Sequence, residues 1–183
     1  VYFSGRIKDT SYFDTVQLIT PQDRANGFLA KYDKDGNFKW VRQFGSITPI
    51  LGGQGLPATQ GTGVQIDNQN NIILTGFYDD SCYFSIDLVL PSNCDTAIGS
   101  TCSNFFIAKY NTDGEIIWVR KADETSMNSS SSGSGLTVDE NDNLYVLGSF
   151  SDFIRFDTFE LQTSLDPPYH NRNRFLLKLD STG

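Results

Sequence analysis

Carboxylate side chains cluster in short polar segments of this sequence, and carboxylate oxygens are preferred ligands of calcium. Two such segments are Asp33-Lys-Asp-Gly36 and Asp139-Glu-Asn-Asp142. A calcium ion takes about six to eight oxygen ligands, usually from a longer loop. Asp, Asn and Gly are also favoured in tight turns for backbone reasons alone. We therefore predict that these acids shape turns, with weak calcium binding as the alternative, and we expect no other cofactor.

The sequence contains no recognisable set of catalytic side chains. Its one histidine, His170, has no cysteine or acid at metal-ligand spacing and no identifiable nucleophile to serve. We predict that His170 is a loop residue and that the chain is not an enzyme. The neighbouring Tyr169, Arg172 and Arg174 are weak candidates for a binding edge. The remaining catalytic alternative is an active site in repeats outside this stretch.

The three cysteines, Cys82, Cys94 and Cys102, lie within one short stretch. Cys94 and Cys102 bracket a loop between two strand-like runs, and a disulfide that closes this loop is plausible in an oxidising compartment. The alternative is three reduced thiols, with Cys82 packed beside Tyr83. The odd number of cysteines argues against a larger disulfide framework.

Composition narrows the class of protein. The 183 residues carry a net charge of −8, are 38% hydrophobic and 13% aromatic, and include 14 Phe and 8 Tyr. Abundant aromatic residues favour strands. The acidic balance argues against binding to nucleic acid or to an anionic membrane. No segment has the ~20 consecutive apolar residues that a membrane helix needs, so we expect no membrane insertion.

Three sequence signatures recur in one order. Strand-like segments end in Gly5, Gly76 and Gly148, which are 71 and 72 residues apart, and the same spacings separate Phe13, Phe84 and Phe156. A second signature runs over 28–36, 106–114 and 175–183, and its first two copies continue into a segment containing Trp40 or Trp118. A third runs over 63–71 and 135–143. Such a period indicates tandem structural repeats, and we divide the chain into 1–62, 63–134 and 135–183.

Each repeat is predicted to contain two antiparallel hairpins. Turn residues such as Asn111-Thr-Asp-Gly114 separate strand-like runs, and no segment between them is typical of a helix. Four antiparallel strands per repeat are typical of a propeller blade. Unbroken apolar runs, such as Ile72-Ile-Leu and Ile116-Ile-Trp-Val, indicate sheets covered on both faces. We therefore predict an all-β chain of about two and a half blades of a partial β-propeller, with a β-solenoid as the alternative.

Several recurring residues are assigned structural roles. We expect Trp40 and Trp118 to pack between blades, because a ligand platform need not recur in every blade. The strand glycines should mark a bulge or a close backbone approach. The repeated basic residues should pair with the repeated acids; these are Lys31, Lys109, Lys178, Arg42 and Arg120. The chain begins and ends within a repeat. We therefore expect its end faces to be covered by further blades of the same polypeptide or by identical subunits.

These signatures resemble the SBBP repeat, which is named for seven-bladed β-propellers. The resemblance rests on the Phe-x-Ala-Lys-Tyr-Asp/Asn-x-x-Gly-x-x-x-Trp-Val-Arg stretch, the Gly-x-x-x-Asp-x-x-x-Asn lead-in and the strand that ends in Gly with a following Phe. It implies a large secreted or cell-surface bacterial protein, often adhesin-like and in several cases type IX secretion cargo. The family brings no shared catalytic residue. The loop at 46–62 and the Cys94–Cys102 insert are longer than its usual form.

Together these observations predict a non-catalytic structural or interaction module of a large extracellular or cell-surface repeat protein, such as an adhesin, stalk or filament. The first alternative is a propeller that binds glycans or a protein partner through its loops. An enzyme with its active residues in other blades is the less favoured alternative.

Overall fold

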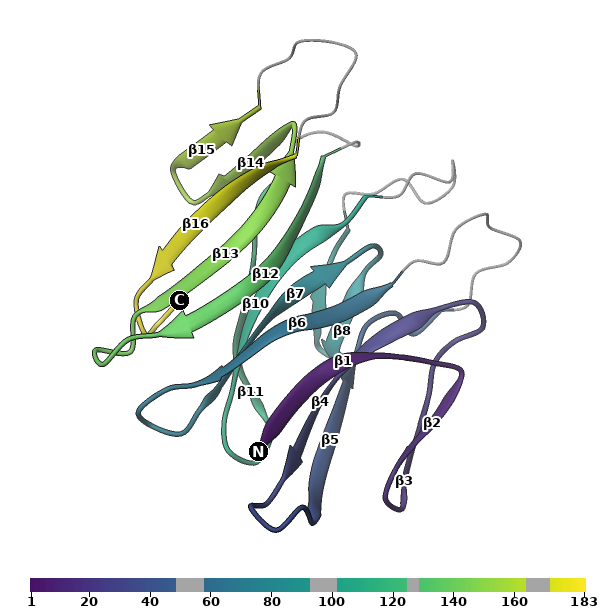
Figure 1. Cartoon of the computed structure of the whole chain (residues 1–183). Coiled ribbons are helices and arrows are strands. Elements are labelled where there is room, and N and C mark those ends of the chain that lie inside the picture. The colour runs from purple at the N-terminus through teal and green to yellow at the C-terminus, as the bar shows by residue number, and fades with distance from the viewer. Residues whose placement is uncertain (49–57, 93–101, 125–128, 164–171) are drawn as a thin grey trace.

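The computed structural model describes residues 1–48, 58–92, 102–124, 129–163 and 172–183. All of the regular structure in these residues is β-structure, in antiparallel sheets of two to four strands. Three larger sheets follow one another as layers, and each is accompanied by a small two-stranded hairpin (Figure 1). The prediction of an all-β chain with antiparallel strands is therefore confirmed. Among the described residues no helix is long and apolar enough to cross a bilayer.

The central sheet has four strands in the order β6-β7-β10-β11. Their bounds are β6 (Thr59–Ile66), β7 (Ile72–Tyr78), β10 (Asn104–Tyr110) and β11 (Ile116–Lys121). All neighbours pair antiparallel, and both hairpin turns within the sheet fall where the Asp- and Asn-rich segments predicted them. Gly114 in the second turn has a φ of 77°, which an L side chain rarely adopts.

The sheets on either side repeat this arrangement with three strands each. The first sheet has the order β1 (Tyr2–Lys8), β4 (Ala25–Tyr32) and β5 (Phe38–Phe44). The third sheet has the order β12 (Ser130–Val138), β13 (Leu144–Ser151) and β16 (Asn173–Leu179). Among the described residues, the first sheet has no counterpart of β6 and the third has no counterpart of β11.

Each repeat also contains a hairpin that the sequence reasoning missed. These hairpins are β2–β3 (Thr10–Phe13 and Val16–Ile19), β8–β9 (Cys82–Ser85 and Leu88–Leu90) and β14–β15 (Phe153–Phe156 and Phe159–Gln162). The prediction of only four strands per repeat was therefore incomplete. Asp14 and Asp157 take positive φ angles of 54° and 51° in two of the tight turns, and Asp tolerates this region better than most residues. Strands this short leave little alternation to read.

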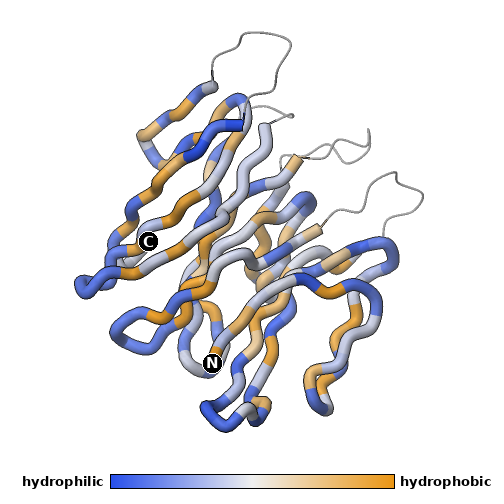
Figure 2. Tube along the Cα trace, in the orientation of Figure 1, coloured by the Kyte–Doolittle hydropathy of each residue, from blue (hydrophilic) through white to orange (hydrophobic). Residues whose placement is uncertain are grey.

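Apolar residues fill both spaces between the three sheets. One buried cluster, which includes Leu29, Leu74 and Phe106, lies between the first and central sheets. Another, which includes Ile73, Ile107 and Val146, lies between the central and third sheets. In Figure 2 the hydrophobic residues lie along the strands and the hydrophilic ones gather at the turns. Burying each such side chain contributes about 1.5–3 kcal/mol, so stacking of the sheets is a large part of the fold's stability.

The apolar runs do not all behave as predicted. Ile72, Ile73 and Leu74 are fully buried, and every residue of β10 is buried. On β11, by contrast, Ile117 is 50% exposed. β11 lies at the edge of the central sheet, and the pairing register shifts opposite Ile117. The expectation that the run 116–119 is covered on both faces was therefore wrong.

The strand glycines make room for a phenylalanine on the neighbouring strand. Gly76 pairs across the sheet with Phe106, and Gly148 pairs with Phe175. A Cβ atom added at Gly76 would lie 2.8 Å from Phe106 Cε1, which is too close for a normal contact. On the other side of each glycine, the pairing register shifts between Gly61 and Gly63 or between Gly133 and Gly135. Both a close approach and a nearby bulge therefore occur at these positions.

Candidate functional site: the contacts between successive sheets

The recurring tryptophans lie at the contacts between sheets. Trp40 on β5 of the first sheet donates a hydrogen bond from Nε1 to the Thr112 carbonyl oxygen, 3.1 Å away and 72 residues further along the chain. Its ring covers Gly114, where an added Cβ would lie 3.1 Å from ring atoms. Trp118 on β11 covers Gly183 in the same way, with the corresponding distance 3.0 Å. Each tryptophan thus rests on the turn of the following sheet.

Basic side chains hold the same turns through backbone carbonyl groups. Arg42 donates to the oxygens of Gly114 (2.9 Å) and Asp113 (2.8 Å). Arg120 donates to the oxygen of Gly183 at 3.0 Å. Both guanidinium groups also lie over tryptophan rings of their own strands, 5.3 and 5.5 Å from the centroids. In both contacts, therefore, one strand carries a tryptophan and an arginine that both contact the turn of the neighbouring sheet.

The lysines differ from the prediction that all of them pair with acids. Lys31 donates to the Thr112 oxygen at 2.8 Å, and Lys178 lies over the Tyr145 ring, 5.3 Å from its centroid. Within the part of the chain that the structure describes, Lys109 alone of the three forms the predicted kind of pair, with Asp67. The reason lies in the turns of the next sheet, which present backbone carbonyl oxygens to Lys31 and Lys109.

Lys109 and Asp67 form a buried ion pair within the central sheet. Their Nζ and Oδ2 atoms are 2.9 Å apart, and the side chains are only 6% and 0% exposed. Burial opposes the ionisation of Asp67, but hydrogen bonds from Asn71 and Lys109 outweigh it, so the pKa of Asp67 lies below its ordinary value. Lys109 also donates to the Ser181 oxygen at 3.1 Å. Lys109 on β10 therefore links the β6–β7 turn of its own sheet to the third sheet.

The turn acids are engaged with their own backbone. Oδ1 of Asp33 accepts from the amides of Asp35 (3.0 Å) and Asn37 (2.9 Å), and Asp139 repeats the pattern with the residues two and four positions on. The side-chain hydrogen bond from Asn37 is the main reason why the pKa of Asp33 lies below its ordinary value. Within the described residues no group of three or more His, Cys, Asp or Glu side chains is placed to hold a metal ion. The turn role predicted for these acids agrees with this geometry.

The β8–β9 and β14–β15 hairpins are hydrogen-bonded to the preceding sheet. Gly45, just after β5, and Tyr83 on β8 exchange backbone hydrogen bonds of 3.1 and 2.9 Å. At the second contact Asp123 and Arg155 exchange two bonds of 2.9 Å, and their side chains form an ion pair at 3.1 Å. The hairpins therefore belong to the contacts between sheets. The recurring phenylalanines were the sequence signal for them.

Those phenylalanines pack the hairpins onto the sheets. The ring centroids of Phe13 and Phe28 lie 4.8 Å apart in the first repeat. The corresponding pairs in the other two repeats are Phe84 with Phe106 at 5.3 Å and Phe156 with Phe175 at 5.1 Å. Such pairs contribute about 0.5–1.5 kcal/mol beyond burial. The same glycine, phenylalanine and hairpin aromatic therefore come together in every repeat.

Strand β6 of the central sheet and strand β12 of the third sheet also take part in the contact between these two sheets. Thr62, at the bulge of β6, donates to the Gly133 oxygen on β12 at 2.8 Å. In the adjacent turns, the Asn68 side chain donates to the Glu140 oxygen at 2.9 Å. Both bonds join residues 71 or 72 positions apart. The central and third sheets are therefore joined at β6, at the turns, at β11 and at the β14–β15 hairpin.

One acid at the second contact is buried. Glu124 follows β11 and is 6% exposed, and it accepts a hydrogen bond from Ser131 on β12. Burial raises the pKa of Glu124 to about 7, against the opposing effect of that hydrogen bond. At the first contact the equivalent position is Ser46, whose backbone amide donates to Asn26 Oδ1 at 3.1 Å. The sequence did not single out Glu124, because the residues next to it in the chain do not indicate that its side chain is buried.

The cysteines are only partly described. Cys82 is a free, fully buried thiol, and burial raises its pKa well above the ordinary value. Cys102 is disulfide-bonded. Cys94 lies outside the described residues, so the predicted Cys94–Cys102 pair stays a prediction.

The predicted binding edge is described only in part. Tyr169 and His170 lie outside the described residues. Arg172 and Arg174 are exposed, and Arg174 on β16 pairs across the sheet with Ser149. Arg174 occupies the position that Phe105 occupies on β10. A role for these residues in binding stays a prediction.

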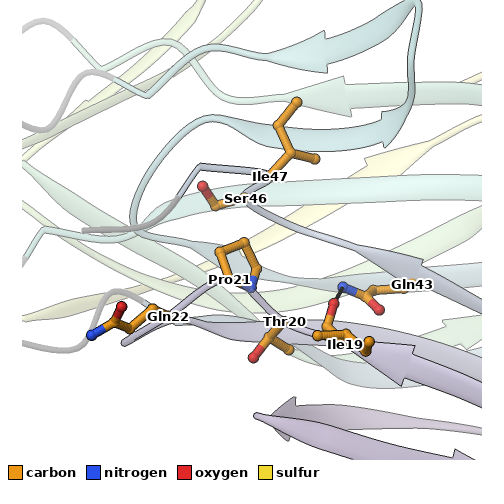
Figure 3. A pocket seen from close by; sticks show the side chains of 7 residues that line it. All are labelled: Ile19, Thr20, Pro21, Gln22, Gln43, Ser46 and Ile47. Carbon is orange, nitrogen blue, oxygen red and sulfur yellow. Dashed lines mark hydrogen bonds between the residues drawn. The ribbon is translucent and has the colours of Figure 1, made fainter. Parts of the chain in front are cut away.

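A shallow hollow of about 530 Å³ lies beside the first sheet, between the end of β3 and the end of β5 (Figure 3). Its lining comprises residues 19–22, Gln43, Ser46 and Ile47. Ile19 and Ile47 are 61% and 56% exposed. The Gln43 amide donates to the Ile19 oxygen at 3.1 Å, which holds the two sides together. Two exposed apolar side chains beside amide groups could contact a small ligand.

Fold and contacts together define a tandem-repeat protein of stacked antiparallel sheets, similar in arrangement to propeller blades. No family model matches the sequence, so the resemblance to the SBBP repeat stays a prediction. A protein of Acanthamoeba polyphaga mimivirus, described as an uncharacterized WD repeat-containing protein, is 30% identical over 128 residues. The match spans 64% of this chain and 8% of that protein. The chain is thus similar to a small part of a much longer repeat protein.

Proposed function

We propose that the chain is a non-catalytic protein–protein interaction module, a section of a β-propeller-like array in a large secreted or cell-surface protein. The observation that carries this proposal is the repeated contact between sheets. The tryptophans and arginines that recur in two repeats, and the lysines that recur in all three, hold sheet to sheet or strand to strand. Similarity to a WD repeat-containing protein supports a repeat module of this kind.

Pairing of β16 with an extended strand, supplied by another protein or by further residues of the same polypeptide, is the proposed mode of interaction. The strands that correspond to β16 are β4 in the first sheet and β10 in the central sheet, and each of them is paired on both sides. Among the described residues β16 pairs only with β13. An exposed sheet edge presents a row of free backbone groups, and an extended protein strand can pair with them. The strand that occupies this position in the central sheet is β11, with the sequence Ile-Ile-Trp-Val-Arg-Lys.

A synthetic peptide of residues 115–121, Glu-Ile-Ile-Trp-Val-Arg-Lys, tests this mode. The peptide is labelled with a fluorophore and titrated with the whole chain. Its fluorescence anisotropy should rise to a plateau, while that of a peptide of the same composition in scrambled order should not rise. A Leu177→Pro variant of β16 should lose the binding, because proline removes a donor from the strand. If the wild type binds both peptides equally well or binds neither, or if a folded Leu177→Pro chain binds the 115–121 peptide as well as the wild type does, strand addition is wrong.

The extracellular location rests on the disulfide-bonded Cys102, because disulfides persist mainly in oxidising compartments. Seven blades, a bacterial source, type IX secretion and an adhesive role rest on the SBBP resemblance alone. Recovery of the intact disulfide from protein made in its native host, with thiols blocked at lysis, tests the location. A fully reduced protein would contradict it.

The hollow beside the first sheet favours a second candidate function, ligand binding. Its exposed isoleucines and its glutamine amides offer apolar and hydrogen-bonding contacts of the kind that a glycan uses. A glycan array probed with the wild type and with Ile47→Asp separates the two roles. Binding that the wild type shows and the variant loses would support a glycan site, and equal signals would remove it.

A further inference from the structure

A buried carboxylate distinguishes the two contacts between sheets. At the second contact, between the central and third sheets, Glu124 follows β11 and is 6% exposed. At the first contact, between the first and central sheets, the corresponding residue is Ser46, which is 5% exposed. A tryptophan, an arginine and a hairpin take part in both contacts. Glu124 therefore gives the second contact a titratable group at a position where the first contact has an uncharged one.

Hydrogen bonds connect Glu124 to strands of both sheets. Ser131 on β12 donates from Oγ to Glu124 Oε1, and the same Oγ accepts from the Phe105 amide on β10 at 2.8 Å. The Ser131 amide donates to the Ser103 carbonyl oxygen, 2.6 Å away. Phe105 and Ser131 are both buried, so these bonds lie away from water. A change in the charge of Glu124 therefore acts directly on the bonds between β10 and β12.

Charged groups from β11 and from the β14–β15 hairpin lie at the same contact. Burial raises the pKa of Glu124 to about 7, against the opposing effects of the Ser131 hydrogen bond and the charge of Lys121. The Lys121 ammonium also lies 3.7 Å from Asp123, which pairs with Arg155 on β14 at 3.1 Å. Both of these ion pairs are partly exposed, so water and salt screen them. Lys121 therefore compensates only in part for the buried charge that Glu124 acquires on ionisation.

A second acid lies at the same end of the central sheet. Burial raises the pKa of Asp79, just after β7, against hydrogen bonds from the Ser103 side chain and a backbone amide. Ser103 also accepts a hydrogen bond from β12 through its carbonyl oxygen. Burial, with smaller effects of Cys82 and Glu124, raises the pKa of Tyr78, so this hydroxyl stays neutral while the acids titrate. Asp79 is therefore the neighbouring group whose titration must be separated from that of Glu124.

We propose that the second contact is a pH-controlled joint, which is closed while Glu124 is protonated and opens locally when Glu124 is ionised. Opening lets water reach the carboxylate, and burial of an ionised group is strongly disfavoured. The closed form binds more protons at Glu124 than the open form, so the equilibrium shifts towards opening as the pH rises from 4.5 to about 7. The first contact, with Ser46 at this position, stays closed over the same range.

Amide hydrogen exchange of the full chain, followed by NMR at about pH 5 and about pH 8, tests the proposal. Protection factors, corrected for the intrinsic effect of pH on exchange, report how often each hydrogen bond opens. The amides of Ser131, Asp123 and Arg155 donate across the second contact, and those of Gly45 and Tyr83 donate across the first. The amides of the second contact should lose protection by about tenfold or more between the two pH values, and those of the first by less than about twofold.

Two variants decide which acid is responsible. Glu124→Gln should keep the amides of the second contact protected at both pH values. If this variant does not fold, Glu124→Ser replaces it, because serine is the residue at the corresponding position of the first contact. Asp79→Asn is the matched control, and it should retain most of the pH-dependent loss.

Four results would overturn the proposal. They are an equal loss of protection at both contacts, no loss at the second contact, a Glu124 variant that retains the full loss, and an Asp79→Asn variant that abolishes it. The proposal does not depend on the interaction proposed for β16, because none of the amides that are followed lies on that strand.

Discussion

The central and third sheets carry the same sequence motif in two different surroundings. β10 is buried along its whole length between two neighbouring sheets. β16 has the same Phe-x-x-Lys pattern, but only Phe175 is buried in it. Lys109 is therefore 5% exposed and ion-paired, while Lys178 lies exposed over a tyrosine ring. The comparison teaches that neighbouring sheets, more than the motif itself, decide what each recurring residue contributes.

The largest expected difference concerns the lysines. Lys109→Met leaves the carboxylate of Asp67 buried without its cation, and breaking a buried pair in this way costs about 3–5 kcal/mol. Lys178→Met removes only an exposed contact with an aromatic ring, worth about 1 kcal/mol. Urea titration of both variants at low protein concentration measures the free energy of unfolding. Equal losses would mean that the two sheets are not in different surroundings.

The neighbouring apolar position should show the same contrast with a somewhat smaller effect. Ile107→Ala leaves a cavity between the central and third sheets and should lower the free energy of unfolding by about 2–5 kcal/mol. Leu176→Ala changes an exposed side chain and should stay within about 0.5 kcal/mol. The same titration checks both values. A large loss at Leu176 would contradict the observation that its side chain is exposed.

The two contacts between sheets should differ in their response to pH. The pKa of Glu124 is raised from 4.5 to about 7 in the folded chain, so the folded state binds more protons there than the unfolded state. Its contribution is complete below pH 4.5 and is lost as the pH rises towards about 7. The loss is on the order of 1–3 kcal/mol.

Glu124→Gln isolates this dependence. The stability of the variant should change less than that of the wild type over the same pH window, as measured by urea titration at several pH values. Ser46→Ala at the equivalent position of the first contact is the control, and it should leave the slope as in the wild type. Parallel curves for the wild type and Glu124→Gln would show that Glu124 titrates normally.

The smallest expected difference concerns the tryptophans. The Trp40 indole donates to the Thr112 oxygen, whereas the buried Trp118 Nε1 has no hydrogen-bond partner among the described residues. Trp40→Phe should therefore cost more than Trp118→Phe by roughly the worth of one hydrogen bond, about 0.5–1.5 kcal/mol. Thermal unfolding of the two variants side by side measures the difference. A larger loss for Trp118→Phe would mean that the indole of Trp118, and not that of Trp40, makes the stronger hydrogen bond.

Local signals in the sequence predicted the local parts of this structure well. The recurring glycine, the Asn and Asp turns and the apolar run of β10 each depend on neighbours close in the chain, and the all-β class follows from them. An acidic partner was predicted for Lys109, but the identity of that partner, Asp67, was not. The two residues are 42 positions apart, and only the sheet register brings them together.

The hairpins and the arginine contacts were also missed, for different reasons. β8 and β9 are four and three residues long, which is too short for a readable alternation of apolar and polar positions. Arg42 was expected to meet acids because its charge suggests that partner. In the folded chain Arg42 donates to the carbonyl oxygens of Asp113 and Gly114. Which backbone groups face a neighbouring sheet depends on how the two sheets pack, and the sequence alone does not show this.

The contacts between sheets join successive repeats, as from Trp40 to Thr112 and from Lys109 to Ser181, and this has a consequence for how such a chain can change length. Among the described residues the bonds that join the sheets run between neighbours in the stack, so the stability behaves approximately as a sum of nearest-neighbour terms. Duplicating residues 63–134 in frame would insert one more layer whose two faces already fit both neighbours. Gene duplication could thus lengthen the stack one unit at a time without redesigning any surface.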